Sequence, residues 1–113
     1  MKIINKTRQC ILADNVKVAD SFLSRMVGLL NRESLANREA LIITHCQSIH
    51  MFFMRFAIDV IFLDKSDRVV GLEKNIKPFC LSRIYFKANN AVEFSSGVID
   101  QSKTELGDQL DIV

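Results

Sequence analysis

The sequence has no tryptophan, one proline and four glycines in its 113 residues. So few chain-breaking residues exclude a collagen-like, Pro-rich or low-complexity chain. The sequence also has no large excess of charge of one sign. It contains 15 Lys and Arg and 13 Asp and Glu, so the formal net charge is only +2. A charge this small and this evenly spread gives no reason to expect nucleic acid or an anionic membrane as the partner.

Long apolar runs are absent as well. Uninterrupted apolar stretches such as 51–54 and 60–63 are about four residues long, whereas a membrane span needs about 18 or more. The segment 1–10 carries Lys2, Lys6 and Arg8 and lacks the apolar core of a secretory signal. We therefore expect a cytoplasmic protein without a transmembrane segment.

Cysteine is scarce and irregularly placed. Cys10, Cys46 and Cys80 are odd in number and form no Cys-x-x-Cys pair, so neither a disulfide framework nor a zinc knuckle is indicated. We expect reduced thiols that serve as small core residues.

What the sequence does contain favours one domain spanning residues 1–113, because 49% of the residues are hydrophobic and 25% are charged. The short β-prone runs 1–5 and 9–13 flank Lys6-Thr7-Arg8 and suggest a hairpin, and 16–19 adds a third fragment. The runs 40–44 and 57–63 are continuously apolar and rich in β-branched residues, which predicts strands buried on both faces. A turn-forming tetrad at 64–67 leads into a strand at 68–72. Further strands are expected at 91–94 and 109–113, and 98–106 is expected to be one helical turn or a loop.

One helix is expected over about 20–31, where Asp20 stands as the N-cap and apolar residues recur at three- and four-residue spacing. Regular alternation of strands and helices is missing, which argues against a doubly wound nucleotide-binding sheet. The pattern predicts a mainly β fold, a small antiparallel sandwich or barrel-like sheet with that one helix packed on it.

The densest group of reactive residues lies at 44–59, which holds both histidines and one cysteine and ends at an aspartate between Ile58 and Val60. A carboxylate in such an apolar strand has to be paired or hydrogen-bonded, because an isolated buried carboxylate is costly. Arg55 and His50 are its nearest candidate partners. Alternatively, Asp59 holds a turn or loop by accepting backbone N–H bonds.

Three catalytic or metal interpretations stay open on residue type alone. His45, Cys46, His50 and Asp59 are zinc or copper ligand types, although adjacent strand residues point to opposite faces. Cys46 and His50 are the types of a nucleophilic pair. Asp59 and Glu93 are the types of an acid and base pair, and the sequence gives no distance between them.

The sulfur and aromatic cluster at 51–54 has two interpretations. Flexible thioethers and rings form adaptable apolar binding surface, with Arg55 beside them to grip a carboxylate or phosphate. The same residues in a small domain also serve as ordinary core.

Longer motifs add a family resemblance. Phe22-x-x-Arg25-x-x-Gly28-Leu29, the segment Cys46-x-Ser48-Ile49-His50-x-x-x-Met54-x-x-x-Ile58-Asp59-Val60-x-Phe62-Leu63-Asp64, and the later Glu93-x-x-x-Gly97 and Gly107-Asp108 closely resemble the DUF192 (UPF0127) family. The resemblance implies a small, mostly β, sandwich-like domain with a helix. It implies no established activity, substrate or cofactor.

From these observations we expect a non-catalytic module that binds a small molecule or a peptide segment in a groove between the 50–59 loop and the 93–97 turn. No catalytic residue, metal ligand or cofactor is assigned. The alternative is a metal-assisted or hydrolase-like enzyme that uses His50, Asp59 and Glu93. The candidate ligand-binding residues are His50, Met54, Arg55, Asp59, Glu93 and Gly97.

Overall fold

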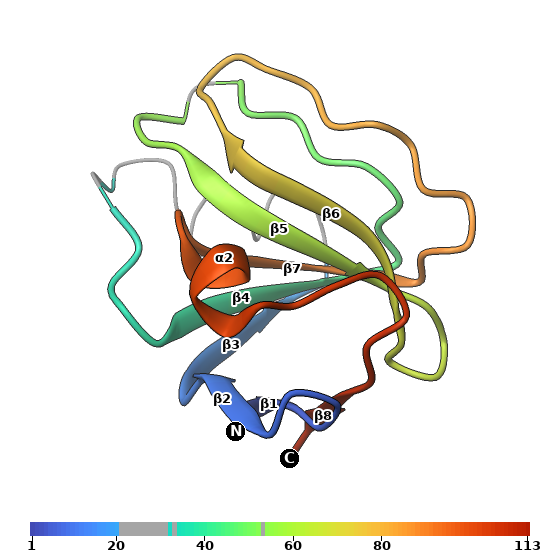
Figure 1. Cartoon of the computed structure of the whole chain (residues 1–113). Coiled ribbons are helices and arrows are strands. Elements are labelled where there is room, and N and C mark those ends of the chain that lie inside the picture. Colours follow the sequence, from blue (N-terminus) through green and yellow to red (C-terminus); the bar gives the residue numbers. More distant parts are fainter. Residues whose placement is uncertain (21–31, 33, 53) are drawn as a thin grey trace.

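The computed structural model describes residues 1–20, 32, 34–52 and 54–113 (Figure 1). Its strands are β1 (Ile3–Asn5), β2 (Cys10–Ala13), β3 (Asn15–Ala19), β4 (Glu39–Thr44), β5 (Ile58–Leu63), β6 (Val69–Ile76), β7 (Asn90–Ser95) and β8 (Leu110–Ile112), and a short helix α2 (Val98–Ser102) stands before β8. The predicted helix over 20–31 lies outside the described residues, apart from Asp20.

The described strands form two sheets, which confirms a mainly β fold. One has three strands in the order β2-β1-β8, and the other has five in the order β3-β4-β7-β5-β6. Of the two predicted arrangements the sandwich is the correct one, since the described sheets do not close into a barrel. The expectation of an antiparallel fold needs one correction, because β3 pairs with β4 in parallel.

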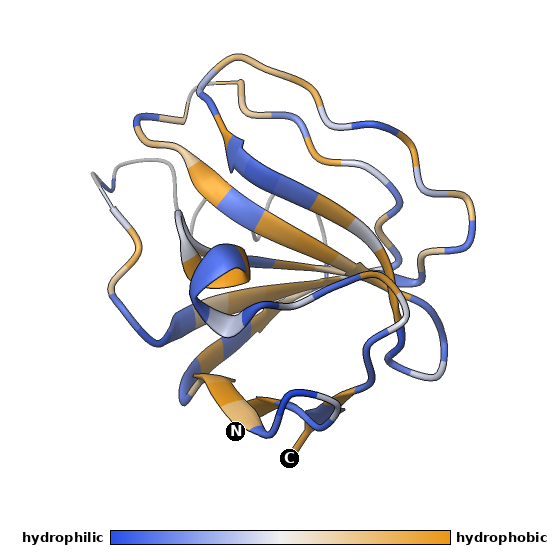
Figure 2. Ribbon diagram, in the orientation of Figure 1, coloured by the Kyte–Doolittle hydropathy of each residue, from blue (hydrophilic) through white to orange (hydrophobic). Residues whose placement is uncertain are grey.

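The five-stranded sheet has apolar residues on both faces. On one face Ile61 and Phe94 belong to a core cluster that includes residues of the three-stranded sheet and α2, such as Ile3, Leu110 and Ile99. On the other face Val60 and Phe62 belong to a second cluster. Burial on both sides explains why β4 and β5 are apolar on both faces rather than alternating, apart from Glu39 and the single hydrophilic position of Asp59 in β5 (Figure 2).

The second face is covered by irregular chain rather than by a sheet. Residues 47–51 and 79–85 run antiparallel, linked by backbone bonds from Met51 N to Cys80 O, from Ser82 N to Ile49 O and from Tyr85 N to Gln47 O. We call the segments 47–52 and 79–86 the arm. Figure 1 shows these two stretches side by side above β5 and β6. Ile49 and Met51 point inward from the arm into the second core cluster.

Candidate functional site

Asp59 is 1% exposed and its carboxylate ties three elements together. Its Oδ1 accepts the Asn75 N–H of β6 at 2.8 Å. Its Oδ2 accepts the N–H groups of Gly97 at 3.1 Å and of Ile99 at 2.9 Å, at the start of α2. The prediction that this carboxylate is buried and accepts backbone N–H bonds is therefore confirmed, whereas Arg55 and His50 are not its hydrogen-bond partners.

A β-bulge explains how the Asn75 amide reaches this carboxylate. In the pairing of β5 with β6, Ile58 is opposite Ile76 and Val60 is opposite Glu73, with a register shift between them. Two residues of β6 thus face Asp59 alone, and a bulge of this kind turns one N–H out of the ladder. The freed Asn75 N–H donates to Asp59.

Glu93 is fully buried in β7, but on the other face of the sheet. Val60 is directly opposite Glu93, and Asp59 is directly opposite Phe94. Residues opposite each other in a sheet point to the same face. Since Val60 and Phe94 belong to different core clusters, the structure does not bring Asp59 and Glu93 together, and they are not placed as an acid and base pair.

The other predicted ligand-binding residues are also divided between core and surface. Met54 is buried in the second core cluster, whereas Arg55 is exposed. His50 is half-buried, and its ring lies 5.1 Å from that of Phe52. The cluster at 51–54 is thus split, because Met51 and Met54 are core while Phe52 is 41% exposed; Phe53 lies outside the described residues.

Gly97 does lie next to the 50–59 loop, as the predicted groove requires. Its N–H bonds to Asp59, and Ser95 pairs with Ile58. Its φ of 102° is a left-handed conformation that a side chain would strain. Because buried Asp59 bonds directly to Gly97, the 50–59 loop and the 93–97 turn are in contact at this point, with no open groove between them.

Two surface hollows are found on the α2 side of the molecule, away from the arm. Neither is lined by a predicted site residue. One, of about 220 Å³, is lined by Cys10, Ile11, Leu12, Asn37, Arg38, Val98, Gln101 and Ser102. The other, of about 310 Å³, is lined by Arg8, Lys74, Ile99, Asp100, Lys103, Thr104 and Glu105.

Beside the second hollow lies a satisfied polar cluster. Buried Asn5 donates to Thr104 and to Asp108, and Arg8 Nε donates to Asp108 at 2.9 Å. Burial by itself raises the pKa of Asp108, but hydrogen bonds from Arg8, the Glu105 amide and Asn5 outweigh it and lower that pKa overall. Since the polar groups of this cluster satisfy one another with hydrogen bonds, we interpret the cluster as structural.

The described residues contain no group of three or more His, Cys, Asp and Glu side chains that could hold a metal ion. Cys46 Sγ donates to the Ser48 carbonyl at 3.1 Å. Nothing in the described geometry gathers His45, Cys46, His50 and Asp59 around one point.

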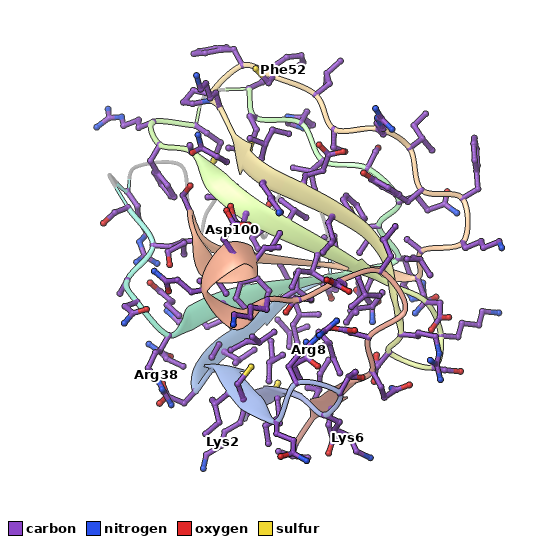
Figure 3. All side chains as sticks on the ribbon, in the orientation of Figure 1. Lys2, Lys6, Arg8, Arg38, Phe52 and Asp100 are labelled. Atoms are coloured by element: carbon purple, nitrogen blue, oxygen red, sulfur yellow. The ribbon has the colours of Figure 1, made fainter. Side chains whose placement is uncertain are left out.

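The arm carries a feature that the sequence reasoning missed. Its large apolar side chains point outward at both ends, from Phe52 (Figure 3) to Phe86, which is 79% exposed. The signal was available as a run of large apolar residues between 79 and 86, interrupted by Cys80 and by Ser82-Arg83. The exposed large apolar side chains of the arm are Phe52, Phe79, Leu81, Ile84 and Phe86.

Tyr85 fastens this arm to the sheet. Its ring stacks on Phe62 with 4.4 Å between centroids, and its hydroxyl donates to Glu73 at 2.7 Å. Burial, together with the hydrogen bond and the charge of Glu73, raises the pKa of Tyr85 to about 12. The ring lies against Gly71, where an added Cβ would come within 2.4 Å of it.

In the described part of the chain, no helix is long and apolar enough to cross a membrane. Among solved structures, a protein of unknown function from Novosphingobium aromaticivorans has the same fold, with a TM-score of 0.81 at 16% identity over 98% of this chain and 82% of that one.

Sequence relatives are nearer. A UPF0127 protein of Thermococcus sibiricus is 39% identical over 96% of this chain and 73% of its own length. A UPF0127 protein of Pyrococcus horikoshii is 36% identical over 96% of both chains. The family model DUF192, described as Uncharacterized ACR, matches residues 3–112. The chain therefore belongs to the DUF192 family, as its motifs indicated.

Proposed function

We propose that this protein is a non-catalytic binding module that takes up a peptide segment on the outer surface of the arm. The observation that carries the proposal is the set of large apolar side chains held outward by the arm. Three of them are phenylalanines, and aromatic side chains are enriched at the cores of protein interfaces.

The rigidity of the arm supports the proposal. Backbone bonds join its two segments, and Tyr85 holds the longer segment against Phe62 and Glu73. A surface that is already ordered loses little conformational entropy on binding. This shifts the predicted groove from the 93–97 turn, where Asp59 closes the contact, to the opposite side of the 50–59 loop.

The proposal also keeps the cytoplasmic location expected from the sequence. Cys10, Cys46 and Cys80, all within the described residues, form no disulfide, which supports a reducing compartment.

A random-peptide display library tests the proposal, with the purified protein as the target. The variant Leu81→Ser/Phe86→Ser removes two anchors, and the control Val18→Ser/Leu106→Ser removes two exposed apolar residues elsewhere. We expect the arm variant to weaken selected peptides by about tenfold or more, with amide shift changes centred on 79–86, while the control binds as the wild type does. A library without binders, or binders that the control variant loses equally, would contradict the proposal.

A further inference from the structure

The arm has a second property, which concerns its charge. From Ala40 to Ile58 and from Lys74 to Val92 the sequence contains no Asp or Glu. Both segments of the arm lie within these two stretches. Besides Lys74, which pairs with Asp100, the two stretches contain four cations, all of them exposed: Arg83 in the arm, Lys87 directly after it, and Arg55 and Lys77.

These cations differ from three arginines elsewhere in the molecule. Arg8, Arg32 and Arg38 each form an ion pair with a carboxylate. Within the residues that the structure describes, no ion pair involves Arg55, Lys77, Arg83 or Lys87. Among the described residues, two acids of β6 and β7 point to the face that the arm covers. Glu93 is fully buried, and Glu73 Oε2 already accepts the Tyr85 hydroxyl and the backbone N–H of Arg83.

The layout of the apolar side chains indicates the shape of the occupant. They are spread along 79–86, a segment that spans about 20 Å when extended, rather than gathered at one protruding tip. The backbone N–H and C=O of Leu81 make no hydrogen bond to the described residues. Leu81 is opposite His50 in an antiparallel bridge, and the hydrogen bonds of this bridge are made by the neighbouring residues, from Met51 N to Cys80 O and from Ser82 N to Ile49 O. The outer edge at Leu81 is thus open to a further extended chain.

We infer that the partner is an extended acidic peptide, in which Asp or Glu alternates with large apolar residues. Its apolar side chains pack on Phe79, Leu81, Ile84 and Phe86, and its carboxylates meet Arg83 and Lys87. The inference rests on the proposed function and names its ligand class. Phe79 and Phe86 have aromatic faces on which a base could stack, whereas Leu81 and Ile84 between them have none. The open backbone at Leu81 and the linear layout suit an extended peptide better than a nucleic acid or a membrane surface, so a peptide is favoured.

The test uses a labelled peptide of about ten residues that contains Phe, Leu and Glu, and a second peptide with Gln in place of every Glu. Binding of both is measured by fluorescence polarisation to the wild type and to Arg83→Glu/Lys87→Glu. The control is Lys2→Glu/Lys6→Glu, which makes the same charge change at the opposite edge of the molecule (Figure 3). Thermal unfolding of each variant establishes that it is folded.

We expect the Glu peptide to bind the wild type about tenfold more tightly than the Gln peptide. This preference should vanish in Arg83→Glu/Lys87→Glu and fall with added salt, while the control keeps it. If Leu81→Ser/Phe86→Ser weakens both peptides but the wild type does not prefer Glu, the acidic ligand class is wrong and the proposed function stands. If neither peptide binds, both fail. If phosphatidylserine vesicles or oligothymidine bind the arm and the peptides do not, the partner class is wrong.

Discussion

Asp59 illustrates how a buried carboxylate can be held without a direct ion pair to any described residue. Three backbone N–H groups donate to its two oxygens, and hydrogen bonds donated to a charged acceptor are stronger than those between neutral groups. The partners come from β6 and from the start of α2, which are distant in sequence. The carboxylate therefore acts as a cross-link between the sheet and the chain that crosses its face.

This role predicts the effect of Asp59→Asn. The amide group can accept at only one of the two oxygen positions, so at least one of the amide donors at Asn75, Gly97 and Ile99 loses its acceptor. We expect the free energy of unfolding to fall by about 2 kcal/mol, measured by urea denaturation.

Asp67→Asn is the matched control, since Asp67 has a φ of 60° that asparagine also tolerates. Burial and the nearby Asp64 and Asp111 raise the pKa of Asp67, so its negative charge is unfavourable in the folded state. Near neutral pH this control should be neutral or stabilising. Equal losses in the two variants would show that the bonds to Asp59 are not what matters.

At this scale the sequence predicts part of the site. Asp59 lies between Ile58 and Val60, and that setting alone requires burial and hydrogen bonds. Its donors could not be foreseen, because Gly97 and Ile99 meet it only through the pairing of β5 with β7. The opposite directions of Asp59 and Glu93 likewise depend on strand register, which side-chain type does not encode.

At the scale of elements, the arm and the sheet are joined through one aromatic contact. Tyr85 occupies the space above Gly71 that a side chain would fill in any other residue of β6. The ring cannot retreat easily, because Phe62 lies behind it and Glu73 holds its hydroxyl. A glycine inside a strand, costly for the strand itself, here makes room for the attachment of the arm.

Gly71→Ala should therefore destabilise the protein by about 2 kcal/mol, since the new Cβ would come within 2.7 Å of three ring carbons of Tyr85. A double-mutant cycle checks the cause. In a Tyr85→Ala background the same substitution should cost much less, because the clash is gone. If Gly71→Ala lowers the stability equally in the wild type and in Tyr85→Ala, the strain does not come from the Tyr85 ring.

The elements themselves were largely predictable, and their pairing was not. Continuous β-branched runs mark β4 and β5, and the tetrad 64–67 forms the expected turn, in which Asp64 Oδ1 accepts the N–H groups of Ser66 and Arg68. The parallel pairing of β3 with β4 leaves no such trace, since alternation shows which face of a strand is buried but not the direction of its neighbour. The arm was missed because it forms an isolated bridge rather than a named strand.

At the scale of the whole molecule, the first and last strands are neighbours. β1 lies between β2 and β8, and Lys2 and Val113 exchange both of their backbone bonds. Figure 1 shows the N and C ends next to each other. Leu110 of β8 is 1% exposed and packs with Ile3 in the first core cluster, so β8 contributes to the core as well as to the sheet.

Leu110→Ala is expected to lower the free energy of unfolding by about 3 kcal/mol, the range for a leucine in a core that cannot collapse around the loss. Leu106→Ala is the control, because Leu106 lies four residues earlier and is 66% exposed; its change should stay within about 0.5 kcal/mol. Thermal and chemical denaturation would both report the difference. Similar values for the two variants would mean that β8 is not part of the cooperative unit.

The adjacency of the chain ends has a consequence for engineering. A few flexible residues would suffice to join Val113 to Met1, and the ring so formed could be cut between Lys65 and Ser66, which are both exposed. Such a circular permutant would keep the contacts between β1 and β8 and make the two strands consecutive in sequence. This antiparallel pair, which now joins the two ends of the chain, would then become a β-hairpin.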